Sequence, residues 1–329
     1  MNGIADVETK NTAFLEFAYK LKVMGVTNWD FCLELRDERL QKIDPFARDS
    51  EGEYAISTDE ISWIKEECRN NPWYFFREIL RIPVKYQKDG KFDPVTDCVR
   101  YSPNGRTITQ TWCFLNGINS WVRDDRQSGK SFGVAAMILW AIKYGKSTGA
   151  KLIGRNMTES RLNIAKIRYM ENALPSYLKD IATSKADSID FSNRKIEVAK
   201  IPRKLVEIER ADLNAPIAWF DDANLIKHLQ LLIETHRKEP AVKDAKKNNI
   251  LYGEIYSSSF DIIMWNNKLE VPDIVQTKDY EEIIRYDAKP WNPYMFDWAL
   301  EPSRSLGCKR LIDVEFKKTR YALVEIFSY

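Results

Sequence analysis

Histidine is almost absent from this sequence, which has 2 histidines among 329 residues. Its five cysteines are widely spaced and form no Cys-x-x-Cys pair: Cys32, Cys68, Cys98, Cys113 and Cys308. Structural zinc sites take their ligands from closely spaced cysteines and histidines, so the sequence argues against such a site. The odd number and wide spacing of the cysteines predict reduced thiols in a cytosolic compartment.

A strong excess of either charge is missing as well. The chain has 50 Lys and Arg against 48 Asp and Glu, so no overall basic field points to nucleic acid, although local basic patches remain open. No apolar run reaches the length of a membrane span, and the N-terminus lacks the apolar core of a signal peptide. We therefore expect a soluble, intracellular protein with no membrane partner. Internal repeats and low-complexity segments are also missing.

What is present is a helical N-terminal part with ordinary globular composition, 44% of the chain being hydrophobic. Helical spacing of apolar residues predicts one or two amphipathic helices over 11–45. Residues 46–57 are polar and indicate a linker or exposed loop, and a helical pattern resumes over 58–80 with a break near Pro72. Three prolines between residues 81 and 105 predict that this segment is mostly loop.

From residue 107 the pattern changes to alternating strands and helices. The expected elements are a helix and a strand over 107–125, a helix over 131–144, a strand over 151–156, a helix over 158–174, a hairpin of 189–201 with 204–210, and strands over 215–224 and 249–259. Such alternation over 110–260 predicts an α/β domain with a mostly parallel sheet.

A candidate phosphate-binding loop lies between the first of these strands and its helix. Gly129-Lys130-Ser131 precedes a long apolar run. In such loops backbone N–H groups cradle the phosphates, the lysine neutralises their charge and the serine binds Mg²⁺. The tripeptide alone is a weak signal. The loop also begins with Asp124 and Asp125 instead of the usual glycine. A solvated lysine at an ordinary helix N-terminus is the alternative.

Two further strand ends strengthen the prediction of a nucleotide site. Asp221 and Asp222 follow four apolar residues, and Ser257–Ser259 end the next predicted strand. One carboxylate can hold Mg²⁺ through water while a second orients the attacking water. The alternatives are a helix cap for the acidic pair and a polar turn for the serines. Because ligands bind at the carboxyl edge of parallel sheets, we expect the three strand ends to meet in one crevice.

These residues resemble a known family. Arg126-Gln127-Ser128-Gly129-Lys130-Ser131 is similar to the deviant Walker A pattern R-Q-x-G-K-[ST] of the large terminase subunit of tailed bacteriophages, the ATPase of the DNA-packaging motor. The stretch 71–78, NPWYFFRE, resembles a motif upstream of that loop, although its aromatic run also fits a core helix. The resemblance spans roughly 70–260. It implies a RecA/ASCE-type P-loop NTPase with a mostly parallel central sheet, a helical N-terminal region and a small C-terminal lid subdomain.

The resemblance also implies ATP and Mg²⁺ as cofactors and a role for each site residue. The nucleotide would be bound by Gln127, Ser128, Gly129, Lys130 and Ser131, with Gln110 recognising the adenine, and the metal by Ser131 and the Walker B Asp221. The catalytic residues would be Lys130, Asp222 and Arg126, the last as an arginine finger in cis. Ser257, Ser258 and Ser259 would couple hydrolysis to movement, and Arg210 would reach a neighbouring subunit. Asp222 departs from the family, which usually has the longer glutamate there. Gln110 also fits a buried helix glutamine, and Arg210 an ordinary surface arginine.

By this resemblance the chain divides into a helical N-terminal region over 1–57, a P-loop ATPase core over 58–260, and a lid subdomain over 261–329. Its last residues would start a linker toward a nuclease domain that this chain lacks, so no nuclease activity is expected. Five basic residues in the lid are candidates for a DNA-facing surface, with a solvated face as the alternative: Lys268, Lys309, Arg310, Lys317 and Lys318.

The expected function is that of an ATP-hydrolysing motor domain that drives double-stranded DNA into a procapsid. The implied partners are DNA, the portal protein, the small terminase subunit, a separate or deleted nuclease domain, and other copies of the chain in a ring on the portal. The implied location is the cytoplasm of an infected bacterial host. Two alternatives stay open: a helicase-like or recombinase-like P-loop ATPase, and a nucleotide-binding docking module without turnover.

Overall fold

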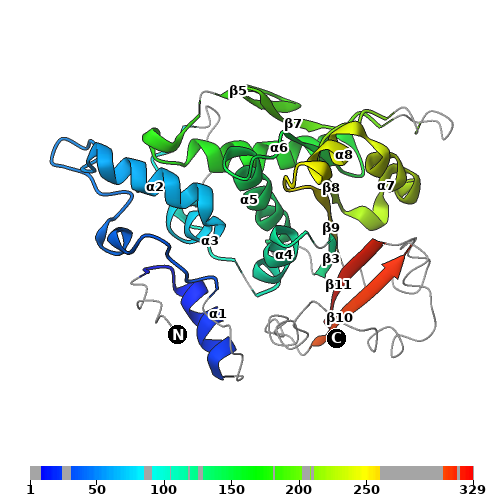
Figure 1. Ribbon diagram of the computed structural model, residues 1–329, viewed down its shortest axis with the longest axis horizontal. Helices are drawn as coiled ribbons and strands as arrows, with labels where there is room; N and C mark the ends of the chain where they lie inside the picture. Colours follow the sequence, from blue (N-terminus) through cyan, green and yellow to red (C-terminus); the bar gives the residue numbers. More distant parts are fainter. Residues whose placement is uncertain are drawn as a thin grey trace.

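A central β-sheet with helices on both faces forms the middle of the molecule (Figure 1). The computed structural model describes residues 9–23, 31–84, 91–103, 105–117, 119–124, 129–180, 182–201, 208, 211–259, 307–316 and 319–328. Among these residues, no helix has the length and apolar character needed to cross a lipid bilayer.

The sheet has nine strands in the order β10-β11-β3-β9-β8-β4-β7-β6-β5. Their bounds are β3 Asn119–Asp124, β4 Gly149–Ile153, β5 Ala182–Lys185, β6 Ser188–Phe191, β7 Arg194–Val198, β8 Ile217–Asp221, β9 Gly253–Ser259, β10 Gly307–Phe316 and β11 Thr319–Ser328. The strands from β11 to β7 are all parallel, and β10, β6 and β5 pair antiparallel at the two edges. The prediction of an α/β fold with a mostly parallel sheet is confirmed.

Apolar side chains cover both faces of this sheet. In β8, Ile217 and Trp219 join one hydrophobic cluster, whereas Ala218 and Phe220 join another, as the alternation of side chains along a strand requires. Three helices lie over the first face: α4 (Gly105–Leu115), α5 (Lys130–Lys143) and α6 (Met157–Asn172). Two lie on the other side: α7 (Leu229–Lys238) and α8 (Pro240–Lys247) (Figure 1). A strand buried on both faces has a continuous run of apolar residues, and residues 217–220, IAWF, are such a run.

Helix α5 is the central helix of the first layer, and nearly all its side chains are buried. Gly133 of α5 lies against α4, because a Cβ atom at this position would collide with Cγ2 of Thr107. The close approach of the two helices therefore requires glycine at residue 133.

The N-terminal helices pack on the same core. They are α1 (Thr12–Val23), α2 (Thr58–Asn70), the single turn α3 (Pro72–Tyr74), the π-helix η2 (Phe75–Ile79) and the 3₁₀ turn η1 (Glu38–Lys42). Phe14 of α1 and Phe75 of η2 belong to the cluster that contains α5. The Trp140 indole of α5 donates to the Cys68 carbonyl at 2.8 Å. The helices before residue 60 thus brace the α/β core, and the aromatic run after Asn71 is core helix.

One local prediction was wrong. The segment 189–201 is not one strand, because a tight turn at Ser192, with φ of 55°, divides it into β6 and β7. Strand β6 pairs antiparallel with β5, which precedes it, and with β7. The predicted partner strand, 204–210, lies outside the described residues except for residue 208. The described residues of 81–105 are mostly loop, as predicted, with one short pairing of β1 (Arg81–Pro83) antiparallel to β2 (Cys98–Arg100).

The C-terminal hairpin β10–β11 joins the central sheet, where β11 runs parallel to β3 (Figure 1). A domain boundary at residue 260 therefore does not separate residues 307–328 from this sheet. Residues 261–306 lie outside the described residues, and a lid subdomain there stays a prediction. Four cysteines, Cys32, Cys68, Cys98 and Cys113, are buried thiols that form no disulfide in the described part of the chain.

Candidate functional site

The candidate site begins at the N-terminus of α5. Gly129 caps the helix with φ 85° and ψ 0°, a left-handed conformation that strains any residue with a side chain. Lys130 is the first helical residue, and it is 7% exposed. The first backbone N–H groups of a helix have no partner within it and carry the positive end of its dipole. The start of α5 therefore offers an anion both backbone donors and a lysine.

The carboxylate of Asp221 lies where four elements meet. Its Oδ1 accepts from the Ser257 hydroxyl of β9 at 2.7 Å and from the Ser131 hydroxyl of α5 at 3.5 Å. Its Oδ2 accepts from the Asn163 amide of α6 at 2.7 Å. Asp221 and Ser257 are opposite one another in the register of β8 and β9, which is why their side chains meet. The three predicted strand ends thus contribute to one cluster of polar groups.

The Ser257 hydroxyl is fully buried and is held on two sides. It donates to Asp221, and it accepts from the indole N–H of Trp219 at 3.1 Å. A hydroxyl has one proton to donate, and the contact with Trp219 leaves that proton for the carboxylate. Ser257 is therefore oriented toward Asp221 by its surroundings.

Helix α6 brings two residues that the sequence did not single out. Asn163 is 1% exposed, and its Oδ1 accepts from the Lys166 ammonium at 2.8 Å. Burial lowers the pKa of Lys166, and the charge of Lys130 acts in the same direction, while Asp221 and Asp222 act to raise it. Lys166 is thus a second cation in this cluster. The sequence signal that could have identified these two residues was their spacing of one helical turn, which an asparagine and a lysine also have in many solvated helices.

Asp222 adopts a left-handed backbone conformation, with φ 49° and ψ 47°. It precedes the 3₁₀ turn η5 (Ala223–Leu225), so the strand ends sharply at this residue. Aspartate tolerates this conformation better than most residues, and such backbone positions cluster at functional sites. Its charge acts on Lys166 across the cluster, as does that of Asp221.

Gln110 lies in α4 and is 1% exposed. Its side-chain amide donates to the Tyr256 carbonyl of β9 at 3.2 Å, which ties α4 to the sheet. This bond is the one expected of a buried helix glutamine, and adenine recognition by Gln110 stays a prediction.

Several predicted residues lie outside what the structure describes. Arg126, Gln127, Ser128 and Arg210 are among them. Ser258 and Ser259 belong to β9, opposite Arg123 and Asp124 of β3, and the structure describes their backbone alone. Their roles in phosphate binding, in trans contacts and in coupling stay predictions.

The oxygen atoms of the cluster fit a magnesium ion that is held together with phosphates. Ser131 supplies a hydroxyl and Asp221 a carboxylate, both hard donors. In the described ranges no group of three or more His, Cys, Asp or Glu side chains forms a cage for a metal. Mg²⁺ seldom uses such cages in phosphate sites, where one or two carboxylates, waters and the phosphate oxygens coordinate it.

Together these groups form a site with cationic donors, hard oxygen ligands and a second carboxylate. Such a set can bind a phosphate anion with a divalent cation and activate a water molecule beside it. The chain matches no protein-family model and no curated protein sequence. An assignment of function for this chain therefore has to be based on the geometry and chemistry of the site.

Proposed function

We propose that this chain is the ATP-hydrolysing motor domain of a viral terminase large subunit, which drives double-stranded DNA into a procapsid. The observation that supports it most is the contact of Asp221 with Ser131, next to Lys130, and with Ser257 of β9. Residues far apart in the sequence, each predicted for one phosphate site, lie within hydrogen-bonding distance of one carboxylate.

The order of the strands supports the finer fold assignment, a RecA/ASCE-type P-loop NTPase. Strand β3 precedes the loop and β8 carries Asp221, and β9 lies between them. Ligands of parallel sheets bind at the carboxyl ends of the strands, and the loop after β3, Asp221 of β8 and Ser257 of β9 lie toward that end of the sheet. Ser257 contacts Asp221 there.

In the proposed mechanism, backbone N–H groups after Gly129 bind the phosphates and Lys130 offsets charge on the transferred phosphoryl group. Ser131 and Asp221 would hold Mg²⁺, which when bound with ATP neutralises charge on the phosphate oxygens. Asp222 orients the attacking water. Arg126 is the proposed arginine finger in cis, and Arg210 is a candidate for a neighbouring subunit.

Coupling to movement would begin at Ser257. Its hydroxyl contacts Asp221 directly and is held by Trp219, so a change at the carboxylate would act on β9 through this contact. Ser258 and Ser259 continue the same strand. We propose that hydrolysis moves the segment after residue 257 and, with it, DNA or a lid subdomain.

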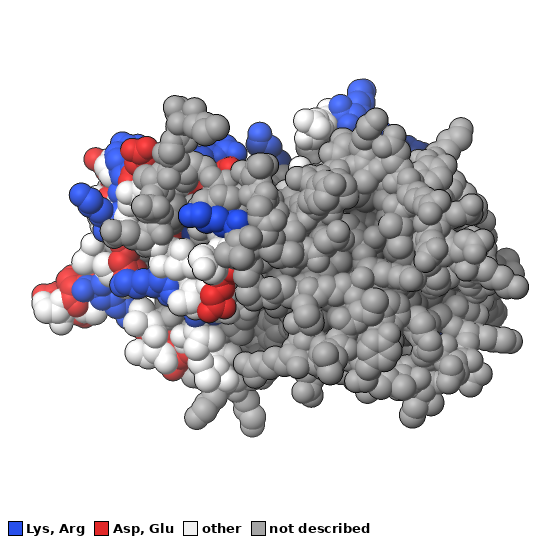
Figure 2. Space-filling view, turned by 90° about the horizontal axis from the view of Figure 1, so that it is seen from below, with Lys and Arg blue, Asp and Glu red and all other residues white. Residues whose placement is uncertain are grey.

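The proposed partners are double-stranded DNA, a portal protein, a small terminase subunit and further copies of the chain in a ring, in the cytoplasm of an infected bacterial host. Figure 2 shows one face of the molecule, where the described basic and acidic side chains are interspersed. The five basic lid residues named above are beyond the side chains that the structure describes. DNA contact is therefore best sought by experiment.

The direct test is steady-state ATP hydrolysis by the chain with Mg²⁺, with and without a DNA duplex. Turnover that requires Mg²⁺ and rises with DNA supports the motor. Nucleotide binding without turnover, even with DNA and a portal ring, would favour a docking module. Unwinding of a duplex would favour a helicase-like ATPase.

Replacement of Asp222 by asparagine tests the proposed role of its carboxylate. We expect kcat to fall about 100-fold or more, because the amide cannot accept a proton from water, while ATP affinity is retained. The matched variant Asp222→Glu keeps a carboxylate and should stay within about tenfold of the wild-type rate. Equal turnover of wild type and Asp222→Asn in a coupled phosphate-release assay would exclude this role.

Asn163 is expected to orient Asp221 for the metal. In the Asn163→Ala variant, Oδ2 of Asp221 loses its amide donor, so the Mg²⁺ concentration for half-maximal turnover should rise about 10- to 100-fold. The rate at saturating Mg²⁺ should change little. Asn172→Ala, at the other end of α6, is the control. An unchanged Mg²⁺ dependence in Asn163→Ala would show that this amide is only structural.

A further inference from the structure

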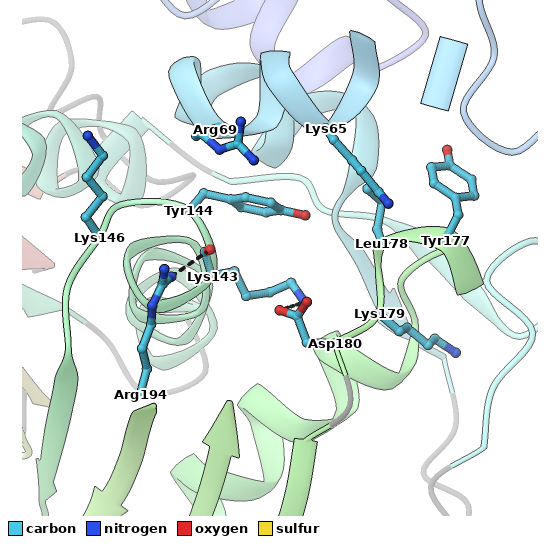
Figure 3. Close-up of a pocket in the computed structure, with 10 residues that line it drawn as sticks. All are labelled: Lys65, Arg69, Lys143, Tyr144, Lys146, Tyr177, Leu178, Lys179, Asp180 and Arg194. Atoms are coloured by element: carbon cyan, nitrogen blue, oxygen red, sulfur yellow. Dashed lines mark hydrogen bonds and ion pairs between the residues drawn. The ribbon is translucent and has the colours of Figure 1, made fainter. Parts of the chain in front are cut away.

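A second group of cations lies far from the loop, around a cavity of about 380 Å³. The cavity lies between α2, the C-terminal end of α5, the turn that follows η3 (Ser176–Leu178), and the start of β7 (Figure 3). Its lining has six basic side chains and one acidic one: Lys65, Arg69, Lys143, Lys146, Lys179 and Arg194, with Asp180. The remaining lining residues are Tyr144, Tyr177 and Leu178.

Only one of the six cations is firmly neutralised. The Lys143 ammonium is buried and contacts Glu171 at 2.9 Å and Asp180 at 2.8 Å. One ammonium here faces two carboxylates, so the three groups together add no positive charge to the cavity. Lys143 therefore belongs to the structure of the pocket wall and contributes no free charge to the cavity.

The positive charges of Arg69 and Arg194 are largely uncompensated by the groups they contact. Arg69 pairs with Glu66 at 2.6 Å, but both side chains are more than half exposed, where such pairs are weak. The Arg194 guanidinium donates to the carbonyls of Ile142 and Lys143 at the end of α5. Carbonyl oxygens accept hydrogen bonds without removing a full charge, so Arg194 is held in place while its charge persists.

Lys65 and Arg69 occupy neighbouring turns of one face of α2 and extend toward the cavity (Figure 3). The hydroxyl of Tyr144 points into the same space from the end of α5. The cavity thus presents ammonium, guanidinium and hydroxyl donors from separate elements. Donors of this kind recognise phosphate oxygens, with Arg suited to bidentate contact.

We propose that this cavity binds a small anion that carries phosphate groups, such as pyrophosphate or a phosphate monoester. Its volume lies within the range of small-molecule pockets, and its recessed position suits a compact ligand better than the backbone of a duplex. The site is separate from the loop, because the 14 residues of α5 span about 21 Å between Lys130 and the cavity. The proposal does not depend on ATP hydrolysis.

Titration calorimetry with inorganic pyrophosphate tests this inference in a Lys130→Ala background, which removes the lysine of the loop. We expect one binding site whose affinity falls at least tenfold in the added double variant Lys65→Ala/Arg69→Ala. The matched control is Lys243→Ala/Lys247→Ala, two exposed lysines with the same spacing on α8, which removes the same charge. This control should stay within about twofold of the parent.

Three results would overturn the inference: no pyrophosphate binding in the Lys130→Ala background, an equal loss of affinity in both double variants, or a loss of duplex DNA binding alone. Lys65 and Arg69 are exposed, and thermal unfolding should show that the double variant folds. The single variant Lys65→Ala, which breaks no ion pair that the structure shows, serves as a milder second test. Failure here would leave the proposed ATPase unaffected, since that is measured at the loop.

Discussion

ATP turnover by the Lys130→Ala variant should be about 100- to 1000-fold slower than that of the wild type. Lys130 is the first residue of α5 and is 7% exposed, so its charge acts on a bound phosphate with little screening by water. Its charge also acts on Lys166, which places both cations near the carboxylates of β8 and the following turn. Loss of this lysine removes stabilisation that is greatest when charge develops on the transferred phosphoryl group.

Phosphate release at saturating ATP and Mg²⁺ measures this effect. Lys227→Ala, an exposed lysine in the segment after Asp222, is the control and should keep wild-type turnover. Circular dichroism and thermal unfolding should show that both variants fold. Wild-type turnover in Lys130→Ala would place any hydrolysis elsewhere and end the proposal of a phosphate-binding loop at residue 129.

The Glu254→Gln variant should be less stable than the wild type by about 3 kcal/mol, because it breaks a buried charge network. Glu254 of β9 is 4% exposed, and its Oε1 accepts from the Arg237 guanidinium at 2.9 Å. The ring of His236 is fully buried, with Nδ1 3.3 Å from the same oxygen and Nε2 3.0 Å from the Ala215 carbonyl. Both ring nitrogens of His236 face oxygen atoms, so the ring belongs to the same buried network.

The same network predicts how stability depends on pH. Burial alone would raise the pKa of Glu254, but the hydrogen bond from His236 and the charge of Arg237 outweigh it and lower the pKa below 4.5. The stability that Glu254 contributes is therefore present above about pH 4.5 and is lost as the pH falls through the folded-state pKa. Glu254→Gln should thus lose less stability than the wild type on acidification.

Urea unfolding at pH 7 and at pH 4 measures both effects. Glu38→Gln, an exposed glutamate in η1, is the control and should change the free energy of unfolding by less than about 0.5 kcal/mol. A Glu254→Gln variant as stable as the control at pH 7 would show that the buried cations find other partners. Parallel acid curves for wild type and Glu254→Gln would contradict the inferred lowering of the pKa.

The sequence by itself determined the elements with strong patterns. The apolar run before Asp221 predicted a buried strand, and the residues after Lys130 predicted a buried helix, which β8 and α5 confirm. The candidate site residues could also be predicted, since a glycine and a lysine before a helix, and acidic residues after a strand, are recognised from their immediate neighbours in the sequence. Local periodicity reports which face of an element is buried, and it is independent of the rest of the chain.

Tertiary structure decided which elements are neighbours. Nothing in the local pattern of α6 indicates that Asn163 meets Asp221, because the two are 58 residues apart and the contact depends on how α6 crosses the sheet. Likewise, only the sheet order places β9 between β3 and β8, and β11 beside β3. Gln110 is polar in the sequence, yet its amide bonds the backbone of a strand 146 residues away. Such contacts depend on packing between distant segments, which neither residue type nor spacing encodes.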